Sequence, residues 1–322
     1  MSAGANFVIT VATILLAASA GYIARRRGLL GERAAERMMT FIAVFGYTAV
    51  GFLSIWQLSP RASDFWLPAL AAVQVVVMTA LGLSAGRGLA RGDSQRGLMG
   101  IACGAGNNGL TMGGFIIYML YGEAGLGMVT IYCLAWMPMT VLLFYPVARH
   151  FASAGPPAPL RTLMFRSIFD WRSIGLPVSL LGLALAWAGV PRPAVVAESH
   201  VVDILMFMVN AMAYMAIGLR LHATDILSLK RAIAGLAAMR FGAGLLVGLG
   251  LAALTLLTPW PLEGMARNVF LIEAFVPTAV TMVAVANMFG LLPRQASALF
   301  IVNTMMYLLL VLPEVMWFFG GR

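Results

Sequence analysis

Two adjacent asparagines stand among five glycines in the middle of an otherwise apolar stretch, 103–114. Glycine destabilises a helix interior by about 1 kcal/mol relative to alanine, so this stretch is a poor continuous helix. An unwound stretch frees backbone N–H and C=O groups that must be satisfied by protein, water or a ligand. Close helix packing through small residues is the alternative, but it does not call for paired asparagines. We therefore predict a helix break whose binding site is lined by Asn107, Asn108, Gly109 and Thr111.

A second break is expected at Pro277, because proline removes a backbone hydrogen bond and clashes with the preceding helical turn. Shifting 107–109 by 168 residues lands on 275–277, so the two breaks are expected at equivalent depth. Two crossing breaks would aim two half-helix N-termini at one point, which suits a carboxylate or another small anion. This binding site would also include Thr278 and Thr281.

Glu273 is the most informative single residue of the sequence. A carboxylate several residues inside an apolar stretch is expensive in a membrane, which makes it a candidate for function. Gln74, Asn108 and Thr130 offer further oxygen atoms, so the four residues form a candidate site for a sodium ion or a proton. The structural alternative has Glu273 protonated or reaching the outer surface, with Gln74 bonded to a neighbour. No other cofactor is expected.

Three more polar residues lie inside apolar stretches. Arg240 is expected to extend back to the inner surface, near Lys230 and Arg231, because long cationic side chains place their charge in water. Substrate binding is the less favoured alternative. Asn210 and Tyr214 are interpreted as bridges between helices, and a position facing a substrate cavity is the alternative. No recognisable nucleophile–base pair or metal pair occurs, so we do not expect an enzyme.

The composition excludes a soluble domain. Of the 322 residues 61% are apolar and 10% are charged, whereas about 25% charged residues are typical of soluble domains. The net charge of +9 does not indicate a nucleic-acid partner, because the arginines lie in short loops rather than along a solvated groove. Apolar runs of roughly 20 residues, enough to cross about 30 Å of hydrocarbon, lie at 6–24, 38–57, 65–86, 97–120, 126–148, 174–190, 201–220, 232–257, 268–290 and 296–319.

The basic residues predict the orientation of these spans. Sixteen of the 21 lie in the connections after odd-numbered spans, and four lie on the opposite side. The positive-inside bias then places both termini in the periplasm of a bacterial inner membrane. Five spans per half is an odd number, so the second half is an inverted repeat of the first. Equivalent helix ends, 168 residues apart, are expected at Gly21 and Gly189, and at Tyr121-Gly122 and Phe289-Gly290.

The chain divides accordingly into two five-helix repeats, 1–150 and 174–322. The connection 151–173 is a cytoplasmic linker. Its apolar residues at helical spacing predict a short helix on the inner membrane face. An ordinary linker is the alternative.

The sequence resembles the auxin efflux carrier family nearly from end to end. The resemblance rests on Gly21-Tyr22 followed by Arg25 to Leu30, Gly106-Asn107-x-Gly109, Tyr121-Gly122, Ile217-Gly218-Leu219, Pro277, Phe289-Gly290 and Ala296-Ser297. The family often has a proline in the second helix, where this chain has Gly46-Tyr47. It usually has another after the fourth-helix glycines, where Gly114 stands here. The first-half break therefore relies on glycine alone.

The resemblance implies an all-α membrane fold of ten helices in two inverted repeats, with crossed broken helices 4 and 9. Helices 1, 2, 6 and 7 would form a scaffold, and helices 3–5 and 8–10 a mobile core. Substrates across the family are organic anions such as auxin, malonate and malate. The more distant bile acid–sodium symporters carry a carboxylate just ahead of the ninth-helix crossover, much as Glu273 stands here.

These expectations combine into one functional prediction. The chain is predicted to be a secondary transporter that moves a mono- or dicarboxylate by elevator-type motion, coupled to sodium. A proton-coupled or uncoupled carrier is the alternative, and a channel or a non-transporting membrane sensor is less favoured. The expected partners are the anion and membrane lipid, with a homodimer through the scaffold helices as an option.

Overall fold

The computed structural model describes residues 3–152, 159, 161–162, 165, 174–220 and 229–320. These residues are helices and loops, apart from one isolated antiparallel bridge between Gly106 and Thr278. The predicted all-α class is therefore confirmed. Most of the linker 151–173 lies outside the described residues, so the helix predicted there stays a prediction.

The first half of the chain contains α1 (Ala3–Arg26), α2 (Glu32–Phe41), α3 (Tyr47–Trp56), α4 (Trp66–Leu89), α5 (Asp93–Gly104), α6 (Gly113–Cys133), α7 (Trp136–Met139) and α8 (Tyr145–Phe151). The second half contains α10 (Gly175–Trp187), α11 (Ala194–Glu198), α12 (Val201–Leu219), α13 (Lys230–Ala237), α14 (Gly244–Thr255), α15 (Gly264–Ala274), α16 (Val280–Phe289), α17 (Pro293–Met306) and α18 (Leu312–Gly320). Single π-helical turns join α2 to α3, α7 to α8, α13 to α14 and α17 to α18.

Six helical stretches among the described residues are long and apolar enough to span a membrane. They are Arg33–Trp56, Ala62–Leu89, Gly113–Phe151, Val201–Leu219, Lys230–Thr255 and Pro293–Gly320. Two predicted spans, 97–120 and 268–290, are each interrupted by an irregular segment, at 105–112 and 275–279. A multi-pass membrane fold is thus confirmed, and the division into ten spans stays a prediction.

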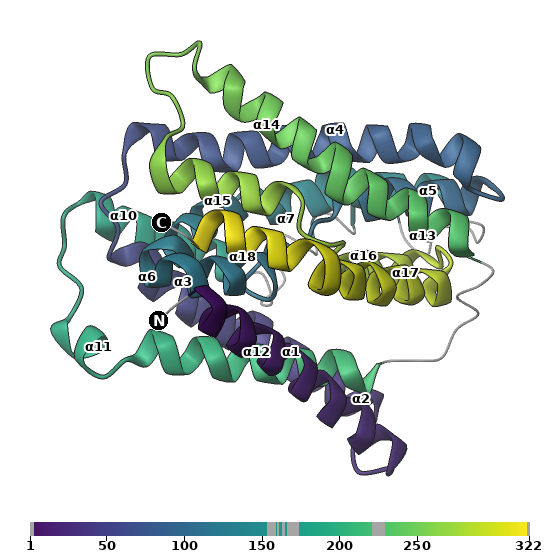
Figure 1. Cartoon of the computed structure of the whole chain (residues 1–322), viewed down its shortest axis with the longest axis horizontal. Helices are drawn as coiled ribbons and strands as arrows, with labels where there is room; N and C mark the ends of the chain where they lie inside the picture. Colours follow the sequence, from purple (N-terminus) through teal and green to yellow (C-terminus); the bar gives the residue numbers. More distant parts are fainter. Residues whose placement is uncertain are drawn as a thin grey trace.

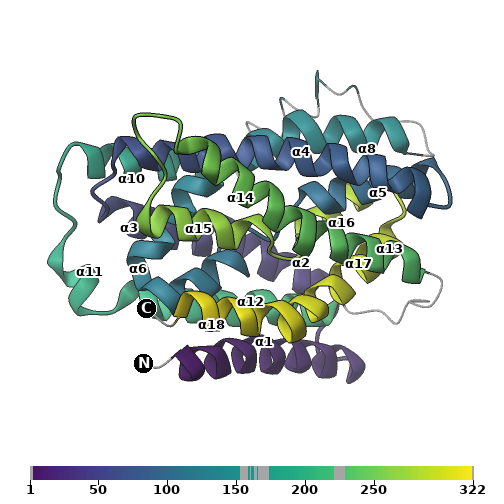
Figure 2. The same cartoon turned by 45° about the horizontal axis from the view of Figure 1, so that its top comes forward.

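Helices α1 and α12 pack side by side through small residues (Figure 2). A Cβ atom on Gly21 would collide with the carbonyl oxygen of Met215, and one on Gly218 with that of Ala18. Because α1 continues to Arg26, the prediction that Gly21 closes the first helix was wrong. Glycine is needed there for the close approach of two backbones.

The second predicted pair of equivalent glycines, Gly122 and Gly290, does interrupt or end helices. Gly122 has a φ of 63° within α6, and Gly290 has a φ of 67° directly after α16. Residues with a Cβ rarely adopt this left-handed region, which is why glycine occupies both positions. Each half-helix that follows a break thus ends at a positive-φ glycine.

The remaining helices pack around the two irregular segments. Helix α4 lies along α5, α14 contacts both α4 and α15, and α16 contacts α17. Figure 1 places both ends of the chain at one end of the molecule, and the α1–α2 turn, the α4–α5 turn and the start of α13 at the other. These three basic segments therefore lie away from the termini, and the orientation in the membrane stays a prediction.

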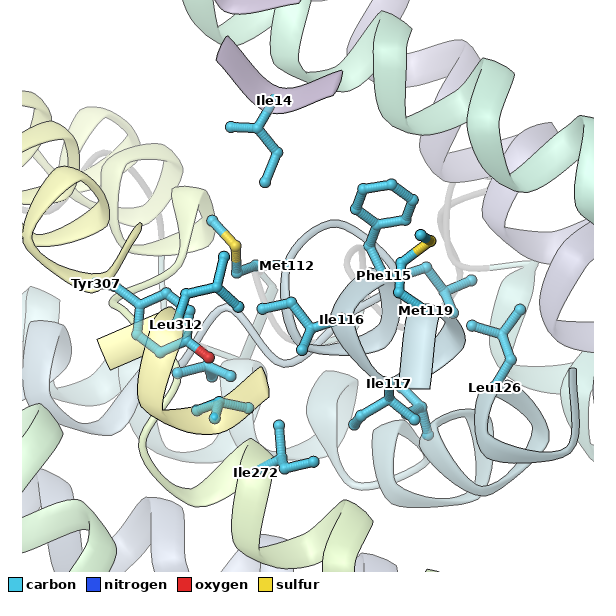
Figure 3. Packing of buried hydrophobic residues seen from close by; sticks show 14 of the residues in the cluster. Ile14, Met112, Phe115, Ile116, Ile117, Met119, Leu126, Ile272, Tyr307 and Leu312 are labelled. Atoms are coloured by element: carbon cyan, nitrogen blue, oxygen red, sulfur yellow. The ribbon is translucent and has the colours of Figure 1, made fainter. Parts of the chain in front are cut away.

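An apolar cluster surrounds the start of α6 (Figure 3). Phe115, Ile116 and Ile117 of α6 are fully buried, and they pack with Ile272 of α15 and Leu312 of α18. Lipid is as apolar as these side chains, so close packing rather than transfer from water stabilises such contacts in a membrane. The cluster fixes the half-helix that begins at the first break.

Candidate functional site

The two irregular segments cross and pair through their backbones. The N–H of Asn107 donates to the carbonyl oxygen of Pro277 at 2.7 Å, and the N–H of Ala279 donates to the carbonyl oxygen of Ala105 at 2.7 Å. Proline has no N–H and cannot continue the ladder of α15. Each break therefore satisfies polar groups that the other has freed, which is required away from water.

The rest of the crossing backbone is bonded locally and to α17. The N–H groups of Gly113 and Gly114 donate to the carbonyl oxygens of Asn107 and Gly109, each at 3.0 Å. The N–H of Thr278 donates to Oδ1 of Asn303, 2.8 Å away. The sequence analysis overlooked Asn303, although an amide inside an apolar segment is the same signal that singled out Asn107.

Arg240 points into the crossing rather than to the membrane surface. Its guanidinium donates to the carbonyl oxygen of Val276 at 2.9 Å and to that of Cys103 at 2.8 Å, and the side chain is 2% exposed. The expectation that it extends towards Lys230 and Arg231 was therefore wrong. Carbonyl groups freed at the end of α5 and in the second break carry partial negative charge, and they attract the cation.

Glu273 lies in the last turn of α15 and is fully buried. Neither carboxylate oxygen has a hydrogen-bond partner in the part of the chain that the structure describes. A Cβ atom on Gly113 would lie 2.6 Å from the carboxyl carbon of Glu273. The carboxyl group thus sits beside the N-terminus of α6, where the helix dipole favours negative charge.

Asn108 links Glu273 to the second half of α6. Its Nδ2 donates to the backbone carbonyl oxygen of Glu273 at 2.7 Å and to the hydroxyl oxygen of Tyr132 at 3.1 Å. The thiol of Cys133 contacts the carbonyl oxygen of Asn108 at 3.5 Å. Nothing in the sequence around Tyr132 indicated this role, since a tyrosine in an apolar helix is ordinary packing.

The candidate cation residues are only partly brought together. Gln74 reaches the end of α15 from α4, where its Nε2 donates to the carbonyl oxygen of Ala274 at 2.8 Å and its Oε1 has no described partner. Thr130 instead bonds the carbonyl oxygen of Leu126 in its own helix and lies against Gly51 of α3. No described contact joins Thr130 to Glu273.

The candidate substrate residues gather at the crossing, except Thr281. The hydroxyl of Thr111 donates to Oδ1 of Asn107 at 2.5 Å, and that of Thr278 donates to the carbonyl oxygen of Ala105 at 3.2 Å. Thr281 lies in the first turn of α16 and is half-buried. The backbone of Gly109 and Pro277 completes the group.

Helix α12 contacts the first break through Tyr214. Its hydroxyl donates to the carbonyl oxygen of Thr111 at 3.0 Å, in line with the interpretation that Tyr214 bridges helices. Asn210 instead donates to the carbonyl oxygen of Met206 in its own helix, at 2.9 Å. The bridge predicted for Asn210 is therefore absent from the described contacts.

Several buried polar atoms near the breaks have no partner among the described residues. Buried polar groups in native proteins are nearly always bonded to protein or ordered water, so such atoms mark places for water or a ligand. On α4, α17 and the π-helical turn after α17 they are Gln74 Oε1, Asn303 Nδ2, Thr304 Oγ1 and Tyr307 Oη. Tyr307 is also close enough to Glu273 and Arg240 to interact with their charges.

The comparison with protein families matches almost the whole chain. The family described as membrane transport protein, to which the auxin efflux carriers belong, covers residues 6–314. No individual curated protein matches the chain. The match includes both breaks and every candidate residue discussed above.

Proposed function

We propose that this chain, which belongs to the membrane transport protein family of the auxin efflux carriers, is a secondary transporter of a small mono- or dicarboxylate. The pairing of Asn107 with Pro277 is the observation that carries the proposal. Helices α6 and α16 begin directly after the two breaks. A helix N-terminus carries roughly half a positive elementary charge, which suits a carboxylate.

The charges around the crossing suggest how a cation is coupled to the anion. Arg240 supplies a buried positive charge on one side, and Glu273 supplies a buried carboxylate on the other. An ionised Glu273 repels an anionic substrate, and the repulsion is strong where water is excluded. A sodium ion or a proton bound at Glu273 removes this repulsion. We therefore propose symport, in which the cation binds together with the anion.

Sodium is the first candidate for the coupling cation. Sodium needs several oxygen ligands, and the residues present offer the two carboxylate oxygens of Glu273 and the unpartnered Oε1 of Gln74. Backbone carbonyl oxygens of the breaks and Oδ1 of Asn108 would complete the set. Thr130 is the weakest member, because its hydroxyl is bonded within α6.

A proton is the second candidate, and one observation favours it. Neither oxygen of the Glu273 carboxylate makes a hydrogen bond to the described chain, and the side chain is fully buried. Burial without partners penalises the charged form of a carboxylate. A proton alone would neutralise it, without further ligands.

The transport movement proposed here is elevator-type. The group α1, α2–α3, α10 and α12 would act as the scaffold, because its members pack on one another. The other helices would move as a core that carries both breaks. We further propose that both termini are periplasmic in a bacterial inner membrane, and that scaffold helices supply any homodimer contact.

A ligand screen tests the proposal directly. The purified chain is heated with each of a panel of mono- and dicarboxylates, in sodium chloride or choline chloride of equal ionic strength. A ligand at 100 times its dissociation constant stabilises the folded state by about 2.7 kcal/mol. Hits are then tested for saturable uptake into proteoliposomes, since unitary currents would indicate a channel and absence of uptake a sensor.

Two variants place the ligand at the crossing. Asn107→Leu removes the side-chain amide but keeps the backbone bond to Pro277, so the protein should fold and lose ligand-dependent stabilisation. Pro277→Ala keeps the carbonyl oxygen but restores an N–H, which disturbs the break. Ligand stabilisation that survives in both variants would place the substrate elsewhere and overturn the proposal.

A further inference from the structure

A small basic cavity lies far from the crossing, between the α4–α5 turn and the start of α13. Its volume is about 240 Å³. Clefts that enclose drug-sized ligands are typically about 300–1,000 Å³, so this cavity suits a group of headgroup size. The lining residues are Gly88, Leu89, Ala90, Arg91, Gln95, Leu229, Lys230, Arg231 and Ala232.

The cavity lies where two membrane spans meet water. One span, Ala62–Leu89, ends at a lining residue, and another, Lys230–Thr255, begins at one. The lining combines apolar residues with three exposed cations. This combination of apolar and basic lining fits the headgroup region of a bilayer, where phosphates lie above the acyl chains.

The positive charge in the cavity is unpaired within the described residues. Arg91, Lys230 and Arg231 take part in neither of the two ion pairs there, and the lining contains no acidic residue. A second cavity of about 290 Å³ shares Arg91, Gln95 and Leu229 with the first. It adds one carboxylate, Asp93, so the positive charge is concentrated in the first cavity.

The backbone around the cavity is held in place. Oε1 of Gln95 accepts the N–H of Arg91 at 2.7 Å, and Nε2 of Gln95 donates to Oε1 of Gln295 on α17 at 3.0 Å. Gln95 is buried. The α4–α5 turn is therefore tied to a third helix, and the cavity is part of the fold rather than a gap in a free loop.

The helix that carries two of the cations adds to the positive potential. Helix α13 starts at Lys230, and its first N–H groups lack helical acceptors. Their partial positive charge lies beside the ammonium and guanidinium groups. Other basic residues at this end of the molecule, such as Arg33 and Arg37 on α2, line neither cavity. The general positive-inside bias therefore does not explain why these three cations surround a hollow.

We propose that this cavity binds a phosphate group through Arg91, Lys230 and Arg231. The phosphate group belongs either to the headgroup of an anionic phospholipid or to a soluble phosphate. The site is separate from the transport crossing and does not depend on the proposed function. Apart from Gln95 of α5, its lining residues belong to α4, α13 and the connections next to them. A bound phosphate would therefore tie α4 to the start of α13.

The test uses the full chain in detergent, with one pair of matched double variants. Lys230→Gln/Arg231→Gln removes two charges from the cavity. Arg33→Gln/Arg37→Gln removes two exposed charges from the same end of the molecule, outside the cavity. Each protein is titrated with dioleoylphosphatidylglycerol, with dioleoylphosphatidylcholine and with inorganic phosphate, and the unfolding temperature and the lipid retained in native mass spectrometry are recorded.

Phosphatidylglycerol should stabilise the wild-type chain more than phosphatidylcholine does. Each basic residue near a membrane surface contributes about 1 kcal/mol to binding of anionic lipid, so the cavity variant, which lacks two of them, should need about 30-fold more phosphatidylglycerol for half-saturation. The control variant should keep the wild-type value. If millimolar inorganic phosphate stabilises the wild-type chain and the control variant but not the cavity variant, the bound group is a soluble phosphate. Equal responses of the two variants to every probe would overturn the proposal.

Discussion

The carboxyl group of Glu273 lies against the α-carbon of Gly113, the first residue of α6. Residue 113 has no room for a side chain, because a Cβ atom there would lie 2.6 Å from the carboxyl carbon. Glu273 lies in the last turn of the half-helix before the second break, and Gly113 begins the half-helix after the first. The contact therefore joins the two halves of the chain at the proposed site.

Gly113→Ala should destabilise the protein by about 1–3 kcal/mol, the usual cost of an overpacked interior. The thermal unfolding midpoint in detergent measures the effect. Gly109→Ala is the control for stability, since a Cβ atom at Gly109 meets no atom within 4 Å. If the clash with the carboxyl group is the cause, Glu273→Ala should recover most of the loss in the double variant. Simple addition of the two single effects would show that the contact is not the cause.

Arg240→Gln should destabilise the crossing, because the carbonyl oxygens of Cys103 and Val276 lose their buried donor. Each orphaned buried group costs about 1–3 kcal/mol. The stability of Arg240→Lys should lie between those of the wild-type chain and Arg240→Gln, since an ammonium keeps the charge but lacks the planar arrangement of guanidinium donors. Arg37→Gln, an exposed change of equal charge, should shift the unfolding midpoint very little. Equal midpoints for the two Gln variants would contradict the assigned role.

How far the sequence predicted this site depended on whether each signal was local. Pro277 lacks an N–H whatever surrounds it, and glycines weaken any helix, so both breaks were predictable. The contacts of Arg240 depend on how the continuous helical stretch of α13 and α14 packs against α5 and α15. No pattern in a single sequence encodes that packing. Thr130 failed to join Glu273 for the same reason: the rotation of α6 turns its side chain towards α3.

Two polar contacts join helices at the end of the molecule where the termini lie. One of them should contribute measurably to the free energy of unfolding. Arg192, between α10 and α11, pairs with Glu123 of α6 and also donates to the carbonyl oxygen of Leu53 at 3.0 Å. The side chains of the pair are 8% and 22% exposed. The second contact joins Tyr118 of α6 to Asp203 of α12 at 2.6 Å.

A double-mutant cycle of Arg192→Gln and Glu123→Gln should give a coupling energy above about 1 kcal/mol, because the pair is largely shielded from water. The exposed pair of His200 and Asp203, with side chains 75% and 46% exposed, is the matched comparison. Its coupling should stay within roughly 0–1 kcal/mol, as for surface ion pairs. Equal coupling in the two pairs would mean that the Arg192 contact does not hold the helices together.

The proposed orientation predicts where fusions to the chain are active. In the predicted ten-span topology, sixteen of the 21 basic residues fall in connections on one side, so that side should be cytoplasmic. An alkaline phosphatase reporter fused after Arg322 should be active, since this enzyme folds only in the periplasm, and a fluorescent protein that requires the cytoplasm should stay dark. The opposite result would mean that the number of spans is wrong by an odd number.

Glu273 should determine how transport depends on cations. In proteoliposomes at constant pH and ionic strength, uptake by the wild-type chain should rise saturably when sodium replaces choline. Glu273→Gln keeps the size of the side chain and removes its charge, so it should abolish that sodium dependence. Tyr307→Phe is the matched control, because it removes a nearby buried hydroxyl but leaves the carboxylate in place.

The remaining outcomes separate the two cations. Equal uptake in sodium and choline, with a pH dependence that Glu273→Gln removes, would exclude sodium and leave the proton. A proton-coupled carrier should be slower at high inside and outside pH, since the protonated carboxyl group is then scarce. Unchanged uptake and an unchanged cation response in Glu273→Gln would reject both, because a carboxylate that couples transport must bind and release the cation within each cycle. Glu273 would then be a structural residue that holds the end of α15 against Gly113.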